Sequence, residues 1–486
     1  MSSSVAPWTI VIYTEGLTFD GATLYETGLG GSESAVCFMA RELAARGHAV
    51  EVFCRTRRPG IYEGVRYRPI AEFPGAAAGR RFDVFIASRT PQVFLLPLRC
   101  RLAVMWNHDN LLQPEQYRQM TFRAEIIFTL SAYHEAEFLA QLPDLAPRLV
   151  RTRNGVDLDL TETARRGALK NRRRLIYASR PERGLEVLLE QIWPRLLARR
   201  PDLELCLCGY QAPDMPGHDH LPALVAQAPR LTALGSLGKR EYYRHLAEAA
   251  VAVYPCTFPE ISCIVALEAQ AVGTPIITTH DFALPETVGV ADYLIGGRPA
   301  LPSYQEAFVE RVLDYLTDGD RYRRDAARAL AHVRQRHAWS AVAGEWEELF
   351  ARHLAGKDRK ASPHYSLVRL RDHGGPATVG PGLSLAPPPL EAKVMPRPGG
   401  LLASVPWREA LEQETRGDWI LVVEDGPPAM LPPLLPYLES HGVDWFAFRR
   451  ASAPAGWVAA VLFRRGRPLS PRNLFLVGLG EEPCAP

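Results

Sequence analysis

The segment FPEISCIVALEAQAVGTPII, residues 258–277, places two glutamates, Glu260 and Glu268, eight positions apart in a run of small and apolar residues. An ionised carboxylate is rarely buried without a partner. Either each glutamate meets a partner within the protein, or both face a ligand. The preceding AVAVYP and the following TPIITT have the pattern of buried strands, so the segment predicts a strand, a loop, a helix ending at Gly273 and a second strand.

The spacing of the two glutamates brings them to one side of this helix. Eight steps of about 100° return close to the starting direction, and a rise of about 1.5 Å per residue separates the carboxylates by roughly 10 Å. That length suits a ligand with a sugar at one end, a ribose at the other and a diphosphate between them. The backbone N–H groups of Ser262, Cys263 and Ile264 would face the phosphates. A capping carboxylate and a glutamate paired with an arginine explain the same spacing.

The totals for the chain exclude several classes of function. The 486 residues predict two or three domains. The net charge of +2 gives no electrostatic reason to expect nucleic acid as a partner. No signal peptide and no apolar run of about 18 residues is evident. Eight cysteines without disulfide spacing favour a cytoplasmic location, and basic clusters at 170–174 and 195–200 allow a weak peripheral contact with an anionic membrane surface.

The first part of the chain alternates strand and helix patterns. WTIVIYT, a glycine-rich loop, a helical stretch ending at Gly47 and HAVEVFC form a strand–helix–strand unit, with Ser32 as the expected N-cap of the helix. We therefore predict a Rossmann-like, doubly wound α/β domain over residues 1–160.

The pattern restarts in residues 161–337, which we predict to be a second Rossmann-like domain. RLIYASR, LELCLCG and VAVYP are among its expected strands. An amphipathic helix over 338–359 is expected to close this second domain. Residues 360–400 are rich in Pro and Gly and predict a linker, and residues 401–486 predict a small α/β appendage.

Two further groups of residues suit an anionic ligand. Gly30 and Gly31 precede a helix N-terminus and allow close approach of the backbone, and His108 follows a strand of the first domain. Arg180 and Arg183 follow the first strand of the second domain, and guanidinium groups bind diphosphate oxygens well. Each of these features, taken alone, has a structural explanation as well.

Together the motifs GGSE, NGVD, ASRPERG and the opening segment resemble retaining glycosyltransferases of family 4, which have the GT-B fold. The resemblance covers about residues 8–355 and implies two Rossmann-like domains facing a cleft. It departs from the family pattern at Arg183, where a lysine is usual, and at Ile261 and Ser262, where glycine and phenylalanine are common.

The resemblance also implies roles for the residues. Gly30 and Gly31 would face the donor phosphate and the acceptor side. His108 would hydrogen-bond the donor sugar near the reacting carbon. Arg180 and Arg183 would hold the diphosphate. A sugar hydroxyl would be bound by Glu260, and the ribose hydroxyls by Glu268.

The implied reaction moves a sugar from a nucleoside-diphosphate sugar to an acceptor hydroxyl with retention, without a metal or other cofactor. The acceptor would be a glycan, a lipid-linked glycan or a small molecule. The donor base, the sugar and the linkage are left open by the sequence. A nucleotide-sugar epimerase or hydrolase of the same fold, and a non-enzymatic scaffold that binds nucleotide sugars, are the alternatives.

The C-terminal appendage faintly resembles a fragment of a family 2 glycosyltransferase, which has the GT-A fold. Its segment WREALEQETRGDWILVVEDG predicts a helix, a strand and an acidic turn at Glu424, Asp425 and Gly426. The nucleotide-binding half of that fold is missing, so we predict that residues 401–486 are not catalytic.

Overall fold

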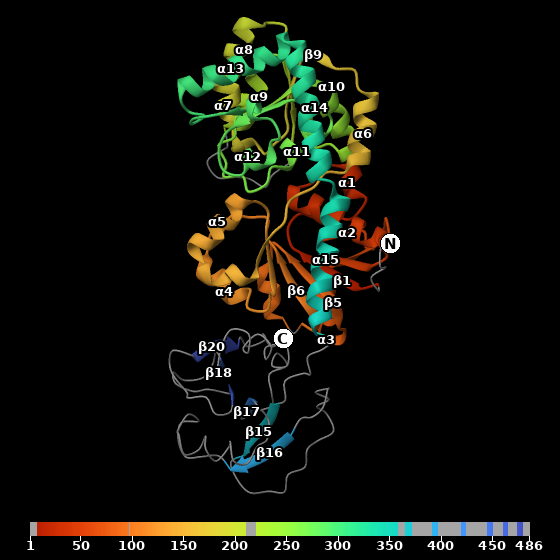
Figure 1. Ribbon diagram of the computed structural model, residues 1–486, viewed down its shortest axis with the longest axis vertical. Helices are drawn as coiled ribbons and strands as arrows, with labels where there is room; N and C mark the ends of the chain where they lie inside the picture. The colour runs from red at the N-terminus through yellow and green to blue at the C-terminus, as the bar shows by residue number, and fades with distance from the viewer. Residues whose placement is uncertain are drawn as a thin grey trace. The chain divides into compact units, whose positions relative to one another are not determined.

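The computed structural model describes residues 7–96, 98–209 and 220–357, followed by six strands between 365 and 479. Contacts divide the chain into two compact units, Met1–Leu354 and Ala355–Pro486. The first unit contains two α/β domains, each built on its own sheet (Figure 1). The predicted α/β class is confirmed.

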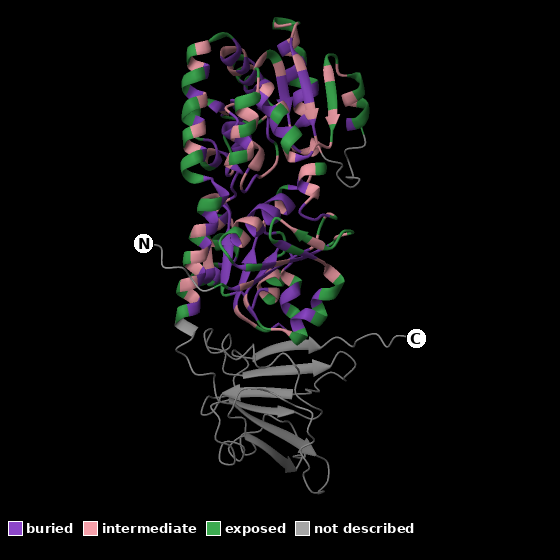
Figure 2. Cartoon of the chain, turned by 90° about the vertical axis from the view of Figure 1, so that its right-hand side faces the viewer, coloured by how far each residue is buried: buried purple, intermediate pink, exposed green. Residues whose placement is uncertain are grey.

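The first domain is an eight-stranded sheet in the order β3-β4-β2-β1-β5-β6-β7-β8, parallel except for the β3–β4 pair. Its central strands are almost entirely apolar and buried, as expected for a sheet covered on both faces (Figure 2). The strands are β1 (Thr9–Thr14), β2 (Ala49–Cys54), β3 (Gly60–Tyr62), β4 (Val65–Pro69), β5 (Phe82–Ser88), β6 (Cys100–Trp106), β7 (Ile126–Thr129) and β8 (Leu149–Arg151). The α-helices are α1 (Thr23–Glu26), α2 (Gly31–Ala45), α3 (Phe73–Gly79), α4 (Pro114–Met120) and α5 (Ala132–Gln141).

The second domain is a six-stranded parallel sheet in the order β11-β10-β9-β12-β13-β14. Its strands are β9 (Asn171–Tyr177), β10 (Glu204–Cys208), β11 (Leu231–Gly235), β12 (Ala249–Tyr254), β13 (Ile276–Thr279) and β14 (Leu294–Ile295). Its helices include α6 (Leu158–Gly167), α7 (Leu185–Val187), α8 (Trp193–Arg199), α9 (Leu221–Gln227), α10 (Lys239–Glu248), α11 (Ile264–Ala271), α12 (Leu284–Thr287), α13 (Pro302–Thr317) and α14 (Gly319–Arg336). The predicted domain boundary at residue 160 falls within α6.

The last long helix, α15 (Trp339–Lys357), packs against the first domain and not the second (Figure 1). The side chain of Trp346 is buried, and its ring stacks on Phe128 of β7 with centroids 4.4 Å apart. Trp106 of β6 meets the same ring edge-on at 4.8 Å. Periodicity correctly predicts the apolar stripe, but the prediction that this helix closes the second domain is wrong, because the matching aromatic surface lies on the first sheet.

The predicted linker over 360–400 is also corrected by the structure. Strands β15 (Tyr365–Arg371) and β16 (Glu391–Pro396) lie within it and pair in parallel. They belong to a third sheet, in the order β16-β15-β17-β19-β18-β20. The other strands are β17 (Trp419–Val423), β18 (Trp445–Arg450), β19 (Ala460–Arg464) and β20 (Leu474–Leu479). The predicted strand before the acidic turn is present as β17, whereas Glu424, Asp425, Gly426 and the helix expected before β17 lie outside the described residues.

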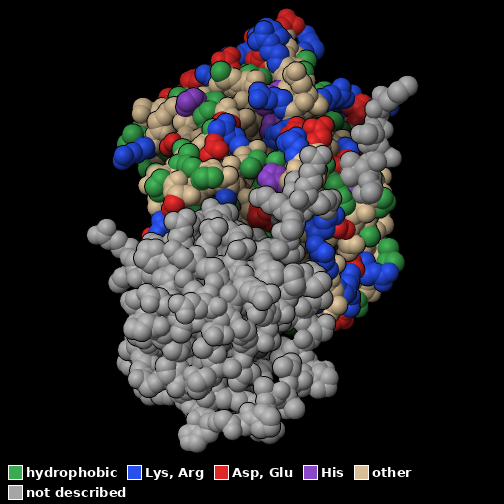
Figure 3. Space-filling view, turned by 60° about the horizontal axis from the view of Figure 1, so that its bottom comes forward, with side chains coloured by type: hydrophobic (Ala, Val, Ile, Leu, Met, Phe, Trp, Pro, Cys, Tyr) green, Lys and Arg blue, Asp and Glu red, His purple; other side chains and the backbone are tan. Residues whose placement is uncertain are grey.

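Among the described residues, no helix is both long and apolar enough to cross a membrane. On the visible face of these residues, basic and acidic side chains are interspersed (Figure 3). This agrees with the near balance of 56 basic and 54 acidic residues in the chain.

Candidate active site

A cavity of about 640 Å³ lies between the two domains of the first unit, at the carboxyl ends of both parallel sheets. Ligands bind at this edge in open α/β sheets, because the loops that follow the strands converge there. The cavity brings together every residue that the sequence predicts for the site: Gly30, Gly31, His108, Arg180, Arg183, Glu260, Ser262, Cys263, Ile264 and Glu268.

The glycine loop of the first domain is shaped around a buried carboxylate, that of Glu33. A Cβ on Gly30 would lie 2.3 Å from Glu33 Oε2, and a Cβ on Gly16, whose φ is +144°, would lie 2.4 Å from Oε1. The positive φ favours glycine at Gly16, and a side chain at Gly30 would displace the carboxylate of Glu33. Gly30 is the N-cap of α2, and Ser32, the expected cap, instead donates its hydroxyl to Glu33 at 2.9 Å. Glu33 thus fixes the loop whose glycines border the cavity.

An arginine connects Glu33 to the loop after β6. Arg89 follows β5 with a φ of +64°, a strained conformation for a residue other than glycine. Its guanidinium binds Asp109 through two hydrogen bonds of 2.8 and 2.9 Å, and its Nη1 lies 3.6 Å from Glu33 Oε1. The sequence analysis gives no role to Glu33, although it ends the motif GGSE, or to Arg89, since neither residue type is unusual at the start of a helix or the end of a strand.

His108 directly precedes Asp109 and lines the cavity. Its ring packs on Trp106 with centroids 4.4 Å apart. Burial, aided by the positive charge of Arg89, lowers the pKa of His108 to about 3, so the imidazole is neutral at neutral pH. Its Nε2 is buried and has no hydrogen-bond partner among the described residues. A neutral imidazole nitrogen in that position can donate to or accept from a ligand hydroxyl.

In the second domain, Arg183 is held beside Glu260. Its Nη1 donates to Glu260 Oε1 at 2.9 Å, and its guanidinium lies 4.0 Å from the centre of the Phe258 ring. The next residue, Gly184, has a φ of +125°, and a Cβ there would lie 2.1 Å from the carbonyl oxygen of Pro255. Glycine at this position lets the arginine loop approach the loop after β12.

Glu260 is only 5% exposed, and the same oxygen, Oε1, also accepts a 2.6 Å hydrogen bond from Tyr254. Burial and the charge of Glu260 raise the pKa of Tyr254 well above its usual value, so this hydroxyl stays a donor. Arg180, the second predicted cation, forms an ion pair with Glu182.

Glu268 lies in the middle of α11, about two turns after Glu260, and is 2% exposed. Its Oε1 is bound by Lys239 and accepts a 2.9 Å hydrogen bond from Tyr243. Both explanations that the sequence offers for the two glutamates therefore apply. Each glutamate has a cation and a tyrosine as partners within the protein, and both line the cavity.

The N-terminus of α11 faces the start of α2 across the cavity. Cys263 is its N-cap, and no acidic residue lies in its first turn. The carbonyl oxygen of Ser262 accepts a 3.3 Å hydrogen bond from Asn154, and the side chain of Ile264 lies 3.4 Å from where a Cβ on Gly31 would be. Burial raises the pKa of the Cys263 thiol well above its usual value, so the thiol is not ionised.

The charges that line the cavity balance. Four basic residues, Arg89, Arg180, Arg183 and Lys239, and four acidic ones, Glu33, Asp109, Glu260 and Glu268, lie on its wall. No group of three or more potential metal ligands occurs among the residues that the structure describes. Arginine and lysine side chains such as these bind the oxygens of anionic ligands through charge-assisted hydrogen bonds.

Comparison with known proteins gives a match to a family model within the second domain. Residues 172–318 match the model of the family described as glycosyl transferases group 1. No curated protein matches the chain.

Solved structures share the fold of the first unit. The sucrose-phosphate synthase from Thermosynechococcus elongatus has a TM-score of 0.57 at 18% identity, over 72% of this chain and 99% of that one. Anabaena HepE, in complex with UDP and glucose, has a TM-score of 0.52 at 19% identity, over 70% and 99%. The catalytic domain of starch synthase IV from Arabidopsis thaliana, bound to ADP and acarbose, has a TM-score of 0.53 at 12% identity, over 72% and 100%.

At these identities the similarity establishes the fold alone, which is the GT-B architecture that the sequence predicts. Residues 172–318 therefore match a group 1 glycosyl transferase domain, in a chain whose first unit has the GT-B fold.

Proposed function

We propose that the protein is a metal-independent retaining glycosyltransferase of family 4 that uses a nucleoside-diphosphate sugar. The observation that carries this proposal is the convergence, in one cavity, of two buried glutamates, two arginines, a helix N-terminus and a neutral histidine. HepE and starch synthase IV bind UDP and ADP respectively, so a uridine or adenosine diphosphate sugar is the first donor to test.

The donor would lie along α11. Its diphosphate would meet Arg180, Arg183 and the N–H groups of Ser262, Cys263 and Ile264, where the positive end of the helix dipole also favours negative charge. The glycines of the first domain would border the phosphates from the other side.

The sugar would lie between the two domains, with Glu260 and His108 at its hydroxyl groups. Arg183 donates to Glu260 through Nη1, and a guanidinium carries five N–H donors in a planar fork that suits both carboxylate and phosphate oxygens. Arg183 would then bridge the diphosphate and the carboxylate that holds the sugar, and would fix the distance between them.

Retention needs no covalent nucleophile in this arrangement. The departing diphosphate oxygen accepts the proton of the acceptor hydroxyl on the face that the diphosphate leaves, and the acceptor oxygen forms the new bond on that same face. The contribution of the protein is to stabilise the charge that develops on the diphosphate, through arginines and backbone N–H groups positioned in advance. These groups take the place of a divalent cation.

A panel of UDP, ADP, GDP and their glucose conjugates, measured by thermal shift in excess EDTA, tests donor binding. A ligand that binds only the folded state raises the melting temperature. We expect one nucleotide series to raise it, and no shift with any member would contradict the proposal. Analysis of the products with and without a sugar acceptor then separates a transferase from an epimerase or a hydrolase.

A further inference from the structure

Lys239 is a cavity residue to which neither the sequence patterns nor the resemblance assign a role. It is the first residue of α10, and its side chain is 12% exposed. Its Nζ contacts Glu268 Oε1, and it lies 5.2 and 5.5 Å from the ring centres of Tyr242 and Tyr243. A lysine in such surroundings is committed to one carboxylate and is not a solvated surface charge.

The contacts of the carboxylate are asymmetric. Lys239 and Tyr243 both bind Oε1 of Glu268, so that oxygen is committed to the protein. A carboxylate offers about four acceptor positions in all, so Oε2 keeps the capacity to accept hydrogen bonds from a ligand. Glu268 borders the cavity beside Cys208 and Gly209, at the end of β10. The carboxylate is therefore held in one orientation by Lys239 and Tyr243 before a ligand arrives.

The position of Lys239 is itself fixed by the first domain. A Cβ on the preceding residue, Gly238, would lie 2.0 Å from the carbonyl oxygen of Tyr25, so the start of α10 packs directly on α1. The hydroxyl of Ser236 accepts a 2.9 Å hydrogen bond from the backbone N–H of Gly28. The loop that leads into Lys239 is thus held by backbone contacts from the first domain.

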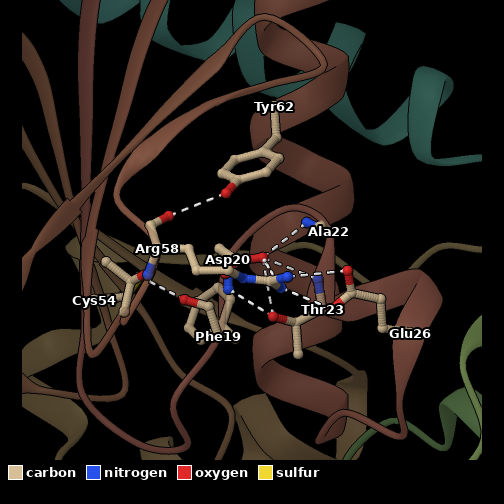
Figure 4. A network of polar contacts seen from close by, with 9 residues as sticks. Phe19, Asp20, Ala22, Thr23, Glu26, Cys54, Arg58 and Tyr62 are labelled. Carbon is tan, nitrogen blue, oxygen red and sulfur yellow. Dashed lines mark hydrogen bonds and ion pairs between the residues drawn. The ribbon is translucent and has the colours of Figure 1, made fainter.

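A network of polar contacts supports α1 in turn (Figure 4). Arg58 donates to Asp20 at 2.9 and 3.0 Å and to Glu26 at 3.0 Å. Although burial acts to raise it, the bonds from Arg58 and Thr23 hold the pKa of Asp20 below its usual value. This network ties α1, on which Gly238 packs, to the loop after β1 and the loop after β2.

We infer that Lys239 is a positioning residue for nucleotide recognition: by holding Glu268 Oε1, it directs Oε2 at the ribose hydroxyls and makes the protein select ribonucleotides over deoxyribonucleotides. This inference rests on the proposed function, in which Glu268 meets the ribose. A freely rotating carboxylate would discriminate less between ribose and deoxyribose. The conformational entropy that it loses when it binds would offset part of the free energy of each hydrogen bond to the ribose.

The test is isothermal titration calorimetry with UDP, ADP and GDP and with their 2′-deoxy and 3′-deoxy counterparts. One hydrogen bond to a charged group changes the dissociation constant by roughly 10- to 100-fold. We therefore expect the wild-type protein to bind the ribose form more tightly than at least one deoxyribose form by that factor. Lys239→Met should reduce that preference at least fivefold, whereas Lys239→Arg should retain most of it. Arg244→Met removes a positive charge from the same helix at an exposed position and serves as the matched control.

The possible results test three claims separately: the proposed function, the contact between Glu268 and the ribose, and the role of Lys239. Binding of none of the nucleotides by the wild-type protein would refute the proposed function and this inference with it. Equal binding of ribose and deoxyribose forms would refute the contact between Glu268 and the ribose. An unchanged preference in Lys239→Met would overturn the role of Lys239 alone. If Lys239→Met does not fold, Lys239→Ala removes the same contact with Oε1 and opens the position to water, and an unchanged preference in that variant overturns the role of Lys239 equally.

Discussion

Replacement of Arg183 by alanine should affect stability and catalysis by two separable routes. The stability route begins at Glu260, which is 5% exposed and would keep the Tyr254 hydroxyl but lose its cation. Loss of one partner from a buried ion pair costs about 3–5 kcal/mol of unfolding free energy. Because the Arg183 side chain is itself 24% exposed, we expect the free energy of unfolding to fall by about 2–3 kcal/mol. The contact with the Phe258 ring adds about 0.5–1 kcal/mol.

The catalytic route concerns the diphosphate. Loss of one or two charge-assisted hydrogen bonds to the leaving group corresponds to about 3–4 kcal/mol of transition-state stabilisation. At about 1.4 kcal/mol for each factor of ten, kcat/KM should fall by roughly 100- to 1,000-fold. Steady-state assays of donor turnover measure this loss, and chemical denaturation measures the change in stability.

A second substitution separates the two routes. In Arg183→Ala combined with Glu260→Gln, no unpaired buried charge remains, so stability should recover by at least about 1 kcal/mol relative to Arg183→Ala alone. Activity should not recover, because the diphosphate contact is still missing. Arg195→Ala, at a partly exposed position on α8, is the control. Recovery of activity in the double variant, or a fall of less than threefold in Arg183→Ala, would refute the assignment of Arg183 to the diphosphate.

Three further predictions concern other parts of the chain. Glu260→Gln should mainly lower kcat, because charge develops near the sugar in the transition state. Glu268→Gln should mainly raise the donor KM and weaken binding of the free nucleoside diphosphate. Equal effects of the two substitutions would indicate that the two glutamates have only a structural role. Asp425→Ala should leave donor turnover unchanged if the C-terminal unit is not catalytic, and a folded but inactive variant would show otherwise. Acidification from pH 7 to pH 5 should lower the melting temperature. Burial lowers the pKa of His108 to about 3 and that of His134 to about 4, so both histidines stay neutral in the folded protein over this range. In the unfolded chain they bind protons as the pH falls below about 6.5, which favours unfolding. Each histidine contributes about 2 kcal/mol to that loss, so the pH dependence should be shallower in His134→Gln.

The sequence predicts the two parallel sheets well, because their strands are short apolar runs separated by amphipathic helices. It fails where pairing is decided at long range. Strands β15 and β16 lie in a segment rich in Pro and Gly, and their local pattern is too weak to indicate strands. Pairing with β17, which follows in the chain, gives them their place in a sheet. The prediction that α15 packs against the second domain fails for the same reason, since an apolar stripe does not specify which surface the helix will contact.

The candidate site shows a similar division. The glutamates, arginines and glycines could be predicted because they follow strand ends and together form the motifs on which the resemblance rests. Glu33 and Lys239 could not, because each lies in the first turn of a helix, where charged residues are common on solvated surfaces. The structure shows that both side chains are largely buried, because they pack at the boundary between the two domains.

Retention without a metal is tested most directly by proton NMR of donor turnover in excess EDTA, with UDP-α-glucose or the glucose conjugate that the binding panel selects. The early spectra distinguish the anomers of the released or transferred sugar before mutarotation mixes them. We predict that the α-anomer appears first and that EDTA does not slow its formation. Early appearance of the β-anomer, or turnover that begins only after magnesium or manganese is added, would contradict the proposed mechanism.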